Sequence, residues 1–222
     1  MRLLIVMLAS MAVAAQAYPP PFPRPNATKL METDRIVVWN VVWPKGEPSP
    51  LHQHVYDQVG TYYAPGGRVI TDITGVRRFA TTEVGAISTT RKGTIHVEEG
   101  TTDPPLRAVF IEIKHATPSG EIDPASDAPP RFPRDGSKRV LDNERVTIWD
   151  DTATPGSSRR FRHAHDAITV WLGSGTLRWT PQNGAATMIA AAPGKIQYNK
   201  RGTTGTEEAI EGSPRAIIFE FK

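Results

Sequence analysis

The residues of this chain best suited to metal chemistry are His52 and His54, one residue apart, and a third histidine, His96, further along. Alternate side chains of an extended strand point to the same face, so His52 and His54 would project together about 7 Å apart. Residues 51–63 are rich in Val and Tyr and contain no proline, which is typical of a strand. Two imidazoles at this spacing can share one ion.

The distribution of the histidines favours a metal over simple hydrogen bonding. Five of the six histidines fall into two similar patterns, and chance would scatter them: His52, His54, His96, His163 and His165. Imidazole-rich sites take Fe, Mn, Ni, Cu or Zn. We therefore predict one divalent transition metal in the first half of the chain.

The chain also contains an internal repeat. The tripeptide Phe22-Pro23-Arg24 recurs as Phe132-Pro133-Arg134, at an offset of 110 residues. Further on, His163-Ala164-His165 aligns with His52-Gln53-His54 at offset 111, and Gly194 with Gly93 at offset 101. This alignment predicts that the second copy has lost about ten residues between its motifs. A period this long indicates a duplicated domain.

Each copy holds seven or eight short β-type runs and no convincing helix, which predicts an all-β fold of two small barrels or sandwiches. The clearest runs cover residues 36–42, 107–113, 169–172 and 216–221. We place the domains at residues 18–114 and 128–222, with an exposed linker at 115–127 that is rich in Pro, Ser, Gly and Asp. Packing the two copies together would bury additional surface.

The N-terminal residues predict export. Residues 1–17 combine Arg2, an apolar stretch too short to span a bilayer, and Ala15-Gln16-Ala17, which is typical of a signal peptide cleaved before Tyr18. The mature chain would carry 26 − 1 − 23 = +2 charges and has no cysteine. We therefore expect no disulfide, no nucleic-acid partner, and no membrane association after cleavage of the signal peptide.

Two segments of the first copy resemble the motifs of the cupin superfamily. Gly46, the two histidines and a polar residue four positions after the second histidine resemble the first motif, and residues 85–96 resemble the second. The resemblance covers nearly all of residues 22–222. It implies two tandem cupin-type barrels, also called double-stranded β-helices or jelly rolls, with His52, His54 and His96 as metal ligands. Gln58 stands where the family has a fourth ligand, Glu, and Arg91 where it has Pro.

The second copy departs further from these motifs. By the alignment above, its matching positions are His163, His165, Thr169 and Gln197. Two imidazoles, a hydroxyl and an amide make a weak site. We expect this degenerate site to bind metal poorly or not at all.

The Gln58 position shapes the chemistry that is available. Three neutral imidazoles and an amide leave a divalent ion its full charge, which suits a chelating enolate, carboxylate or catecholate. The alternative is a weakened site that stores a ligand without turnover. Tyr56 either orients a substrate through its hydroxyl or fills the barrel core, and Arg91 either steers an anion to the ion or is a solvated turn charge.

Together these features predict an exported, metal-binding, two-domain protein. The first hypothesis is a metal-dependent oxidoreductase of the dioxygenase type that acts on a small oxygen-chelating molecule. The second is a non-catalytic cupin that binds a carbohydrate or a carboxylate, and the third a purely structural role. Catalytic residues beyond the metal ligands stay unknown, and assembly into a homo-oligomer stays open. Because a ligating imidazole must be deprotonated, we expect metal loss to begin as the pH falls through about 6.

Overall fold

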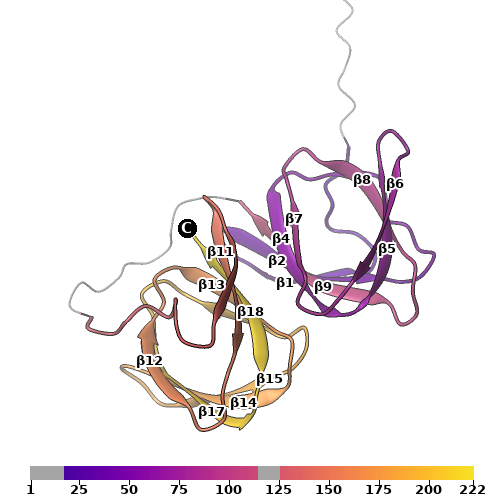
Figure 1. Cartoon of the computed structure of the whole chain (residues 1–222). Helices are drawn as coiled ribbons and strands as arrows, with labels where there is room; N and C mark the ends of the chain where they lie inside the picture. The colour runs from indigo at the N-terminus through magenta and orange to yellow at the C-terminus, as the bar shows by residue number, and fades with distance from the viewer. Residues whose placement is uncertain (1–17, 115–125) are drawn as a thin grey trace, which may run out of the picture.

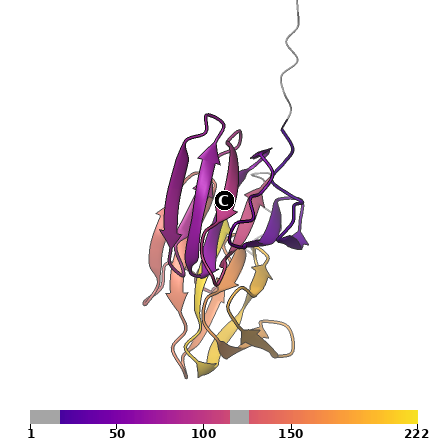
Figure 2. The ribbon, with the colours of Figure 1, turned by 90° about the vertical axis from the view of Figure 1, so that its right-hand side faces the viewer.

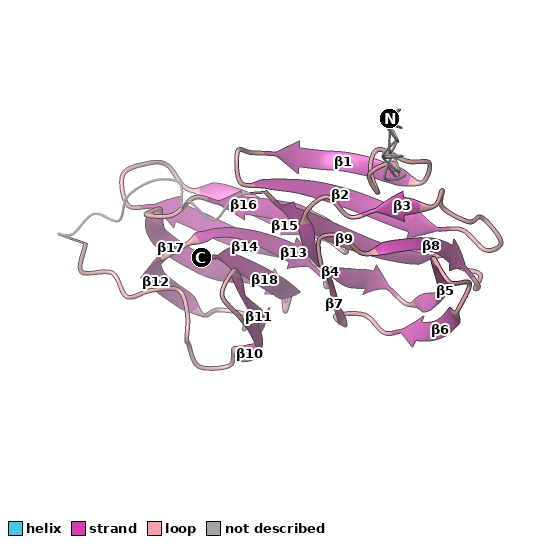
Figure 3. Cartoon of the chain, turned by 90° about the horizontal axis from the view of Figure 1, so that it is seen from above, coloured by secondary structure: helices cyan, strands magenta, loops and turns pink. Residues whose placement is uncertain are grey.

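The computed structural model describes residues 18–114 and 126–222, and within these ranges it contains 18 strands and no helix (Figure 3). The prediction of an all-β chain is confirmed. In the described ranges no helix is long and apolar enough to cross a membrane. The predicted signal peptide, and the predicted linker up to residue 125, lie outside the described residues.

The first nine strands form a barrel of two facing sheets. A five-stranded sheet has the order β1-β2-β9-β4-β7, and a four-stranded sheet has the order β3-β8-β5-β6. The strands are β1 (Ala27–Glu32), β2 (Ile36–Trp43), β3 (His52–Gln53), β4 (Asp57–Ala64), β5 (Gly66–Asp72), β6 (Arg77–Thr82), β7 (Ile87–Thr90), β8 (Ile95–Gly100) and β9 (Leu106–Ile113).

The remaining nine strands repeat this topology, in the orders β10-β11-β18-β13-β16 and β12-β17-β14-β15 (Figure 1). The duplication is therefore present strand by strand, with nine strands per copy rather than seven or eight. The strands are β10 (Lys138–Asp142), β11 (Val146–Thr152), β12 (Ser158–Arg162), β13 (Asp166–Trp171), β14 (Gly175–Pro181), β15 (Thr187–Ala191), β16 (Ile196–Asn199), β17 (Thr204–Gly212) and β18 (Arg215–Phe221).

The near-continuous apolar sequence of β2 follows from burial of both its faces. Trp39, Val41 and Trp43 point into the first barrel, where they pack with Phe22 and Leu106. The alternate residues Ile36 and Val38 instead face the second barrel. The four runs predicted most clearly from the sequence correspond to β2, β9, β13 and β18, and only Leu172 lies beyond the end of its strand.

The two five-stranded sheets pack against each other and share one hydrophobic core. In Figure 2 the first barrel, in indigo to magenta, lies in front of and above the second, in orange to yellow. The buried members of this core come from both barrels: Ile36, Val38, Val59, Val109, Ile111, Ile113, Val146, Ile148, Ile168, Val170, Leu172, Ile217, Phe219 and Phe221. The expectation that the copies bury surface between them is confirmed. Burial of this apolar surface joins the two barrels into one unit.

Two ion pairs cross this interface and relate the barrels by an approximate twofold rotation. Arg35 of the first barrel pairs with Asp166 of the second, and Arg145 of the second pairs with Asp57 of the first. Arg35 and Arg145 occupy equivalent positions in the two copies, at offset 110. The interface therefore resembles that of a symmetric dimer made within one chain.

Candidate metal centre

Two neighbouring strands bring the three histidines of the first barrel together. His52 on β3 lies directly opposite His96 on β8 in the antiparallel ladder. His54 follows β3, and its backbone is held in place because its N–H donates to the Thr94 carbonyl and its carbonyl accepts from the Gly93 N–H. The sequence-distant His96 thus meets the other two because β3 and β8 pair.

The three imidazoles form a compact, buried cluster. Their ring centroids are 5.3 Å apart for His52 and His54, 4.7 Å for His52 and His96, and 5.0 Å for His54 and His96. Each residue offers a ring nitrogen within 4.8 Å of the others, and the Nε2 atoms of His54 and His96 are 3.2 Å apart. Because all three side chains are at most 6% exposed, bulk water is excluded from the cluster.

The protonation of the cluster suits a metal ligand set. The Pro50 carbonyl accepts a hydrogen bond of 2.9 Å from Nδ1 of His52, which leaves Nε2 of a neutral ring with a free lone pair. That Nε2 and the Nδ1 of His54 are buried and have no partner among the described residues. Burial lowers the pKa of His54 to about 3 and of His96 to about 4, so both rings are neutral at pH 7. Neutral imidazoles with unpartnered nitrogens fit a divalent transition metal.

The strand predicted over residues 51–63 is wrong in one respect. Strand β3 ends at Gln53, and β3 and β4 belong to different sheets. Tyr56 is half-buried in the bend between them, so strand alternation does not place it on the histidine face. The cluster of His52 and His54 therefore depends on a turn rather than on one regular strand.

Gln58 and Arg91, the other predicted contributors, lie in different surroundings. Gln58 is buried on β4 directly opposite Glu112 of β9, on the face that carries Tyr62 into the first barrel, and its Oε1 has no partner among the described residues. Arg91 is exposed in the turn after β7 and lines a cavity between the two barrels.

Sequence reasoning missed an acidic residue beside the cluster. Glu98 follows His96 by two positions on β8, so both side chains point to the same face and both are buried. Its carboxylate binds Arg24 at 2.9 Å and also Arg68. Burial opposes ionisation of Glu98, but the charges of Arg68 and Arg24 outweigh it and hold its pKa well below its usual range. Strand alternation from His96 could have identified this residue.

Aromatic rings support this charged network. The Arg68 guanidinium lies 5.1 Å from the ring centroid of Trp43 and 5.4 Å from that of Tyr62. A cavity of about 360 Å³ opens beside the network, and its lining includes Arg24, Trp43, Glu98 and Pro50. Since Pro50 orients His52, this cavity adjoins the surroundings of the histidine cluster.

The register predicted for the second copy is wrong. The His163 N–H donates to Thr203 and its carbonyl accepts from Gly202, as His54 does with Thr94 and Gly93. His163 is therefore the counterpart of His54 at offset 109, and Gly202, not Gly194, is that of Gly93. No ten-residue deletion is needed. His165 is half-buried beyond the matching turn.

The same register reassigns the remaining positions of the second copy. Phe161 opposite Gly205 takes the place of His52 opposite His96. Ala167, opposite Glu220, matches Gln58 opposite Glu112, so Thr169 and Gln197 are not the counterparts of metal ligands. Thr169 instead accepts a hydrogen bond of 3.3 Å from the Asn199 amide.

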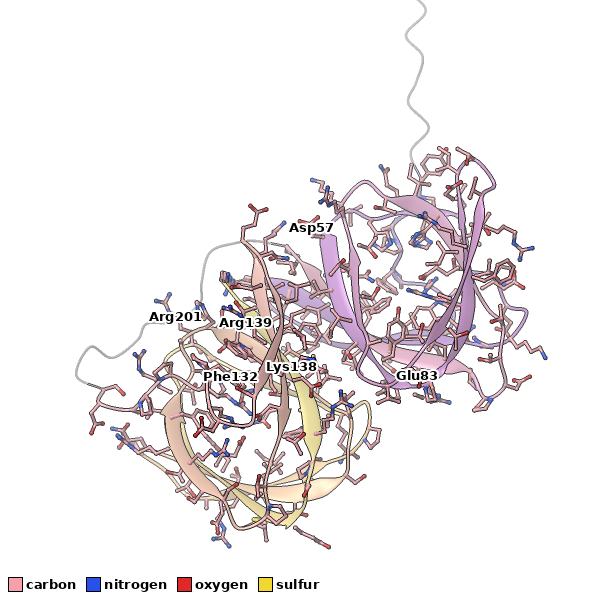
Figure 4. The ribbon with its side chains drawn as sticks, viewed as in Figure 1. Asp57, Glu83, Phe132, Lys138, Arg139 and Arg201 are labelled. Atoms are coloured by element: carbon pink, nitrogen blue, oxygen red, sulfur yellow. The ribbon has the colours of Figure 1, made fainter. Side chains whose placement is uncertain are left out.

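Aromatic rings and a guanidinium occupy the corresponding interior of the second barrel. The Phe161 ring lies 5.5 Å from that of Trp179 and 5.4 Å from that of His163. Arg131, only 4% exposed, lies 5.1 Å from the Phe161 ring centroid. Burial, together with the charges of Arg131 and Arg134, holds the pKa of His163 well below its usual value. At the positions equivalent to His52, His54 and His96, the second barrel thus has one imidazole, that of His163, and the Arg131 guanidinium lies beside it. Figure 4 shows that side chains fill both barrels.

Comparison with known proteins supports the fold. No protein-family model and no curated protein matches the sequence. The structure matches the cupin 2 conserved barrel domain protein from Leptotrichia buccalis, with a TM-score of 0.57 and 12% identity over 88% of each chain. It matches AerE from Microcystis aeruginosa with a TM-score of 0.60 and 12% identity, over 90% of this chain and 98% of that one.

A third similar structure is the oxalate decarboxylase of Bacillus subtilis, studied for its Mn(II) centres. The TM-score is 0.60 at 13% identity, over 88% of this chain and 72% of that one. The chain therefore has the fold of the cupin superfamily in its two-barrel, bicupin form. Within this fold it carries a three-histidine cluster that fits a divalent metal.

Proposed function

We propose that this protein is a metal-dependent oxidoreductase of the dioxygenase type, in which His52, His54 and His96 hold one divalent transition metal. The observation that carries the proposal is the set of three buried imidazoles whose ring nitrogens lie within 4.8 Å of one another; His52 and His54 each have a ring nitrogen without a partner among the described residues. The Mn(II) centres of the similar oxalate decarboxylase support testing Mn alongside Fe, Ni, Cu and Zn.

The bound metal would act as a Lewis acid that polarises a small molecule chelating it through oxygen. The residues of the chain prepare this chemistry. The Pro50 carbonyl fixes the tautomer of His52, so its buried Nε2 carries a lone pair that can bind a metal. Burial keeps water away from the rings, and the pairing of Glu98 with Arg24 and Arg68 holds β8, which carries His96, against the N-terminal segment.

The alternative is a protein that binds a carbohydrate or a carboxylate without turnover, and one observation favours it. The cavity of about 360 Å³ beside Glu98 is lined by Trp43 and by polar residues that include Arg24, Asn26 and Ser49. Several hydrogen-bonding groups around a cavity of this size suit a small polar ligand. Tight ligand binding that is indifferent to a chelator would favour this function over the first.

Elemental analysis of the mature protein, purified without a histidine tag, tests the proposal. We expect one transition metal per chain in the wild type, a loss of most of it in His96→Ala, and full retention in the control His165→Ala. Redox activity should disappear in His96→Ala and in chelator-treated wild type, and return to the latter on adding metal. Equal metal content in wild type and His96→Ala would overturn the proposal.

We also propose that the protein is exported, because residues 1–17 have the pattern of a signal peptide. N-terminal sequencing of the protein from its natural source should then begin at Tyr18. A chain that begins at Met1 would contradict export by this route.

A further inference from the structure

A second cavity, of about 680 Å³, lies at the seam between the two barrels. Asp57, the first residue of β4, is labelled in Figure 4 on the side of the first barrel that faces the second. The lining comes from β4, β7 and β9 of the first barrel and from the β10 to β11 region of the second: Asp57, Gln58, Val59, Thr89, Thr90, Arg91, Ile113, Leu141, Asn143, Glu144, Arg145 and Val146. Its volume is within the range of small-molecule sites.

The approximate twofold symmetry provides an internal comparison, because the interface has a second, equivalent position. Thr89 lies opposite Val59, and the equivalent pair in the second barrel is Tyr198 opposite Ile168. The Tyr198 hydroxyl reaches Asp166 at 3.3 Å. Tyrosine thus fills the second position where threonine leaves room at the first.

The exposure of the two ion pairs agrees with this difference. The side chains of Arg35 and Asp166 are 7% and 2% exposed, whereas those of Arg145 and Asp57 are 30% and 34% exposed. The same ion pair is therefore closed at one position and borders an open cavity at the other. A smaller residue at position 89 accounts for the opening.

The chemistry of the walls indicates the class of ligand. Val59, Ile113, Leu141 and Val146 provide apolar surface. Asp57 and Arg145 neutralise each other, but Arg91 and Glu144 also line the cavity, and among the described residues neither has an ion-pair partner. One unpaired positive and one unpaired negative group complement a ligand that carries both charges.

We propose that this cavity binds a small zwitterion with an apolar body, such as a hydrophobic amino acid or dipeptide. The ligand carboxylate would pair with Arg91, its ammonium group with Glu144, and its side chain would lie on the apolar surface. A simple carboxylate fits less well, because it has no cationic group to pair with Glu144. This site is separate from the histidine cluster and does not depend on the proposed metal chemistry.

The test uses L-leucine, L-phenylalanine and the dipeptide Leu-Phe as probes at millimolar concentration with the full chain. Saturation-transfer NMR should show contact of at least one probe with the wild type. The Thr89→Tyr variant, which copies the filled position, should abolish the signal. The matched control Thr81→Tyr, on the exposed strand β6, should leave it unchanged.

The charges are tested on the probe that binds. Arg91→Gln should weaken binding of the probe about tenfold or more, which is the loss expected for one charge-assisted hydrogen bond. Amidation of the probe carboxylate should weaken binding to a similar extent. Glu144→Gln and N-acetylation of the probe should also weaken binding about tenfold or more, because each removes the pairing of the ammonium group with Glu144. These two substitutions are at exposed residues, so they keep the test valid if Thr89→Tyr fails to fold. No signal from any probe, or a signal that survives all three substitutions, would overturn the proposal.

Discussion

Burial of the imidazoles makes the metal-free protein sensitive to acid. The pKa of His54 is lowered from 6.5 to about 3 and that of His96 to about 4, mainly by desolvation. Below pH 6.5 these two histidines therefore bind protons in the unfolded chain but not in the folded chain. Stability that is present above this pH is lost as the pH falls toward 4. We expect each of these two groups to lower the unfolding free energy by on the order of 3 kcal/mol near pH 4.

Urea unfolding of the metal-free wild type and of His54→Gln, at neutral pH and near pH 4.5, measures this effect. The variant should show a shallower dependence on pH, because one of the shifted groups is gone. Equal slopes would contradict the assignment. The onset of metal loss at about pH 6, expected from an ordinary imidazole, stays a prediction. The lowered pKa values of His54 and His96 mean that protons compete with the metal for these rings mainly at more acidic pH.

Gln58→Glu tests whether this position faces the metal. A carboxylate there adds charge to a site of neutral ligands, and we expect divalent metal to bind about tenfold more tightly. In the metal-free protein the same change places a second acid directly opposite buried Glu112 and should lower stability by about 1 kcal/mol. Competition titration with zinc, using Gln53→Glu as a control, measures the affinity. Unchanged or weaker binding would mean that Gln58 is not a ligand.

At the scale of strands, packing in the second barrel leaves no room for an imidazole at Gly205, the position equivalent to His96. A Cβ added to Gly205 would lie 2.5 Å from the Thr180 carbonyl oxygen and 2.6 Å from the Trp179 ring. We therefore expect Gly205→Ala to lower the unfolding free energy by about 1–3 kcal/mol through overpacking. Gly184→Ala, in an exposed turn where the added Cβ would meet only the Pro181 ring at 2.9 Å, should cost less, and thermal unfolding compares the two. Equal stability of Gly205→Ala and wild type would contradict the packing of Trp179.

The sequence predicted the strands and the histidine cluster more reliably than the register of the repeat. Apolar runs such as β2 and β18 are visible because burial of both faces requires them. The identities of His163 and His165 suggest an offset of 111 residues, although hydrogen bonding matches only His163 to a histidine of the first copy. Glycines in turns are better anchors, since Gly93 and Gly202 have φ values of 88° and 84°, a region that other residues rarely adopt.

At the scale of the whole molecule, the sequence predicted two copies that pack together but not the difference between their equivalent positions. The shared core follows from apolar residues on the outer faces of β2, β9, β11 and β18. That difference depends on Thr89 and Tyr198, which lie at equivalent positions of β7 and β16. Such a difference becomes visible only when the two barrels are placed against each other.

The two interface ion pairs should differ in their contribution to stability. Arg35 donates to Asp166 at 2.7 Å and to the Lys222 carbonyl at 2.6 Å, in a nearly fully buried position. Arg35→Ala removes these bonds and leaves a buried carboxylate without its guanidinium, so we expect a loss of about 3–5 kcal/mol. The matched substitution Arg145→Ala, at the half-exposed pair with Asp57, should cost about 1 kcal/mol or less.

Urea unfolding of both variants, together with Arg35→Ala/Asp166→Ala, measures this difference. The double variant should recover part of the loss, because the carboxylate that was left without its guanidinium is removed as well. Equal losses for the two single variants would mean that the pairs are equally solvated. The interface would then be symmetric in solution, and Thr89 would not open a cavity at the seam.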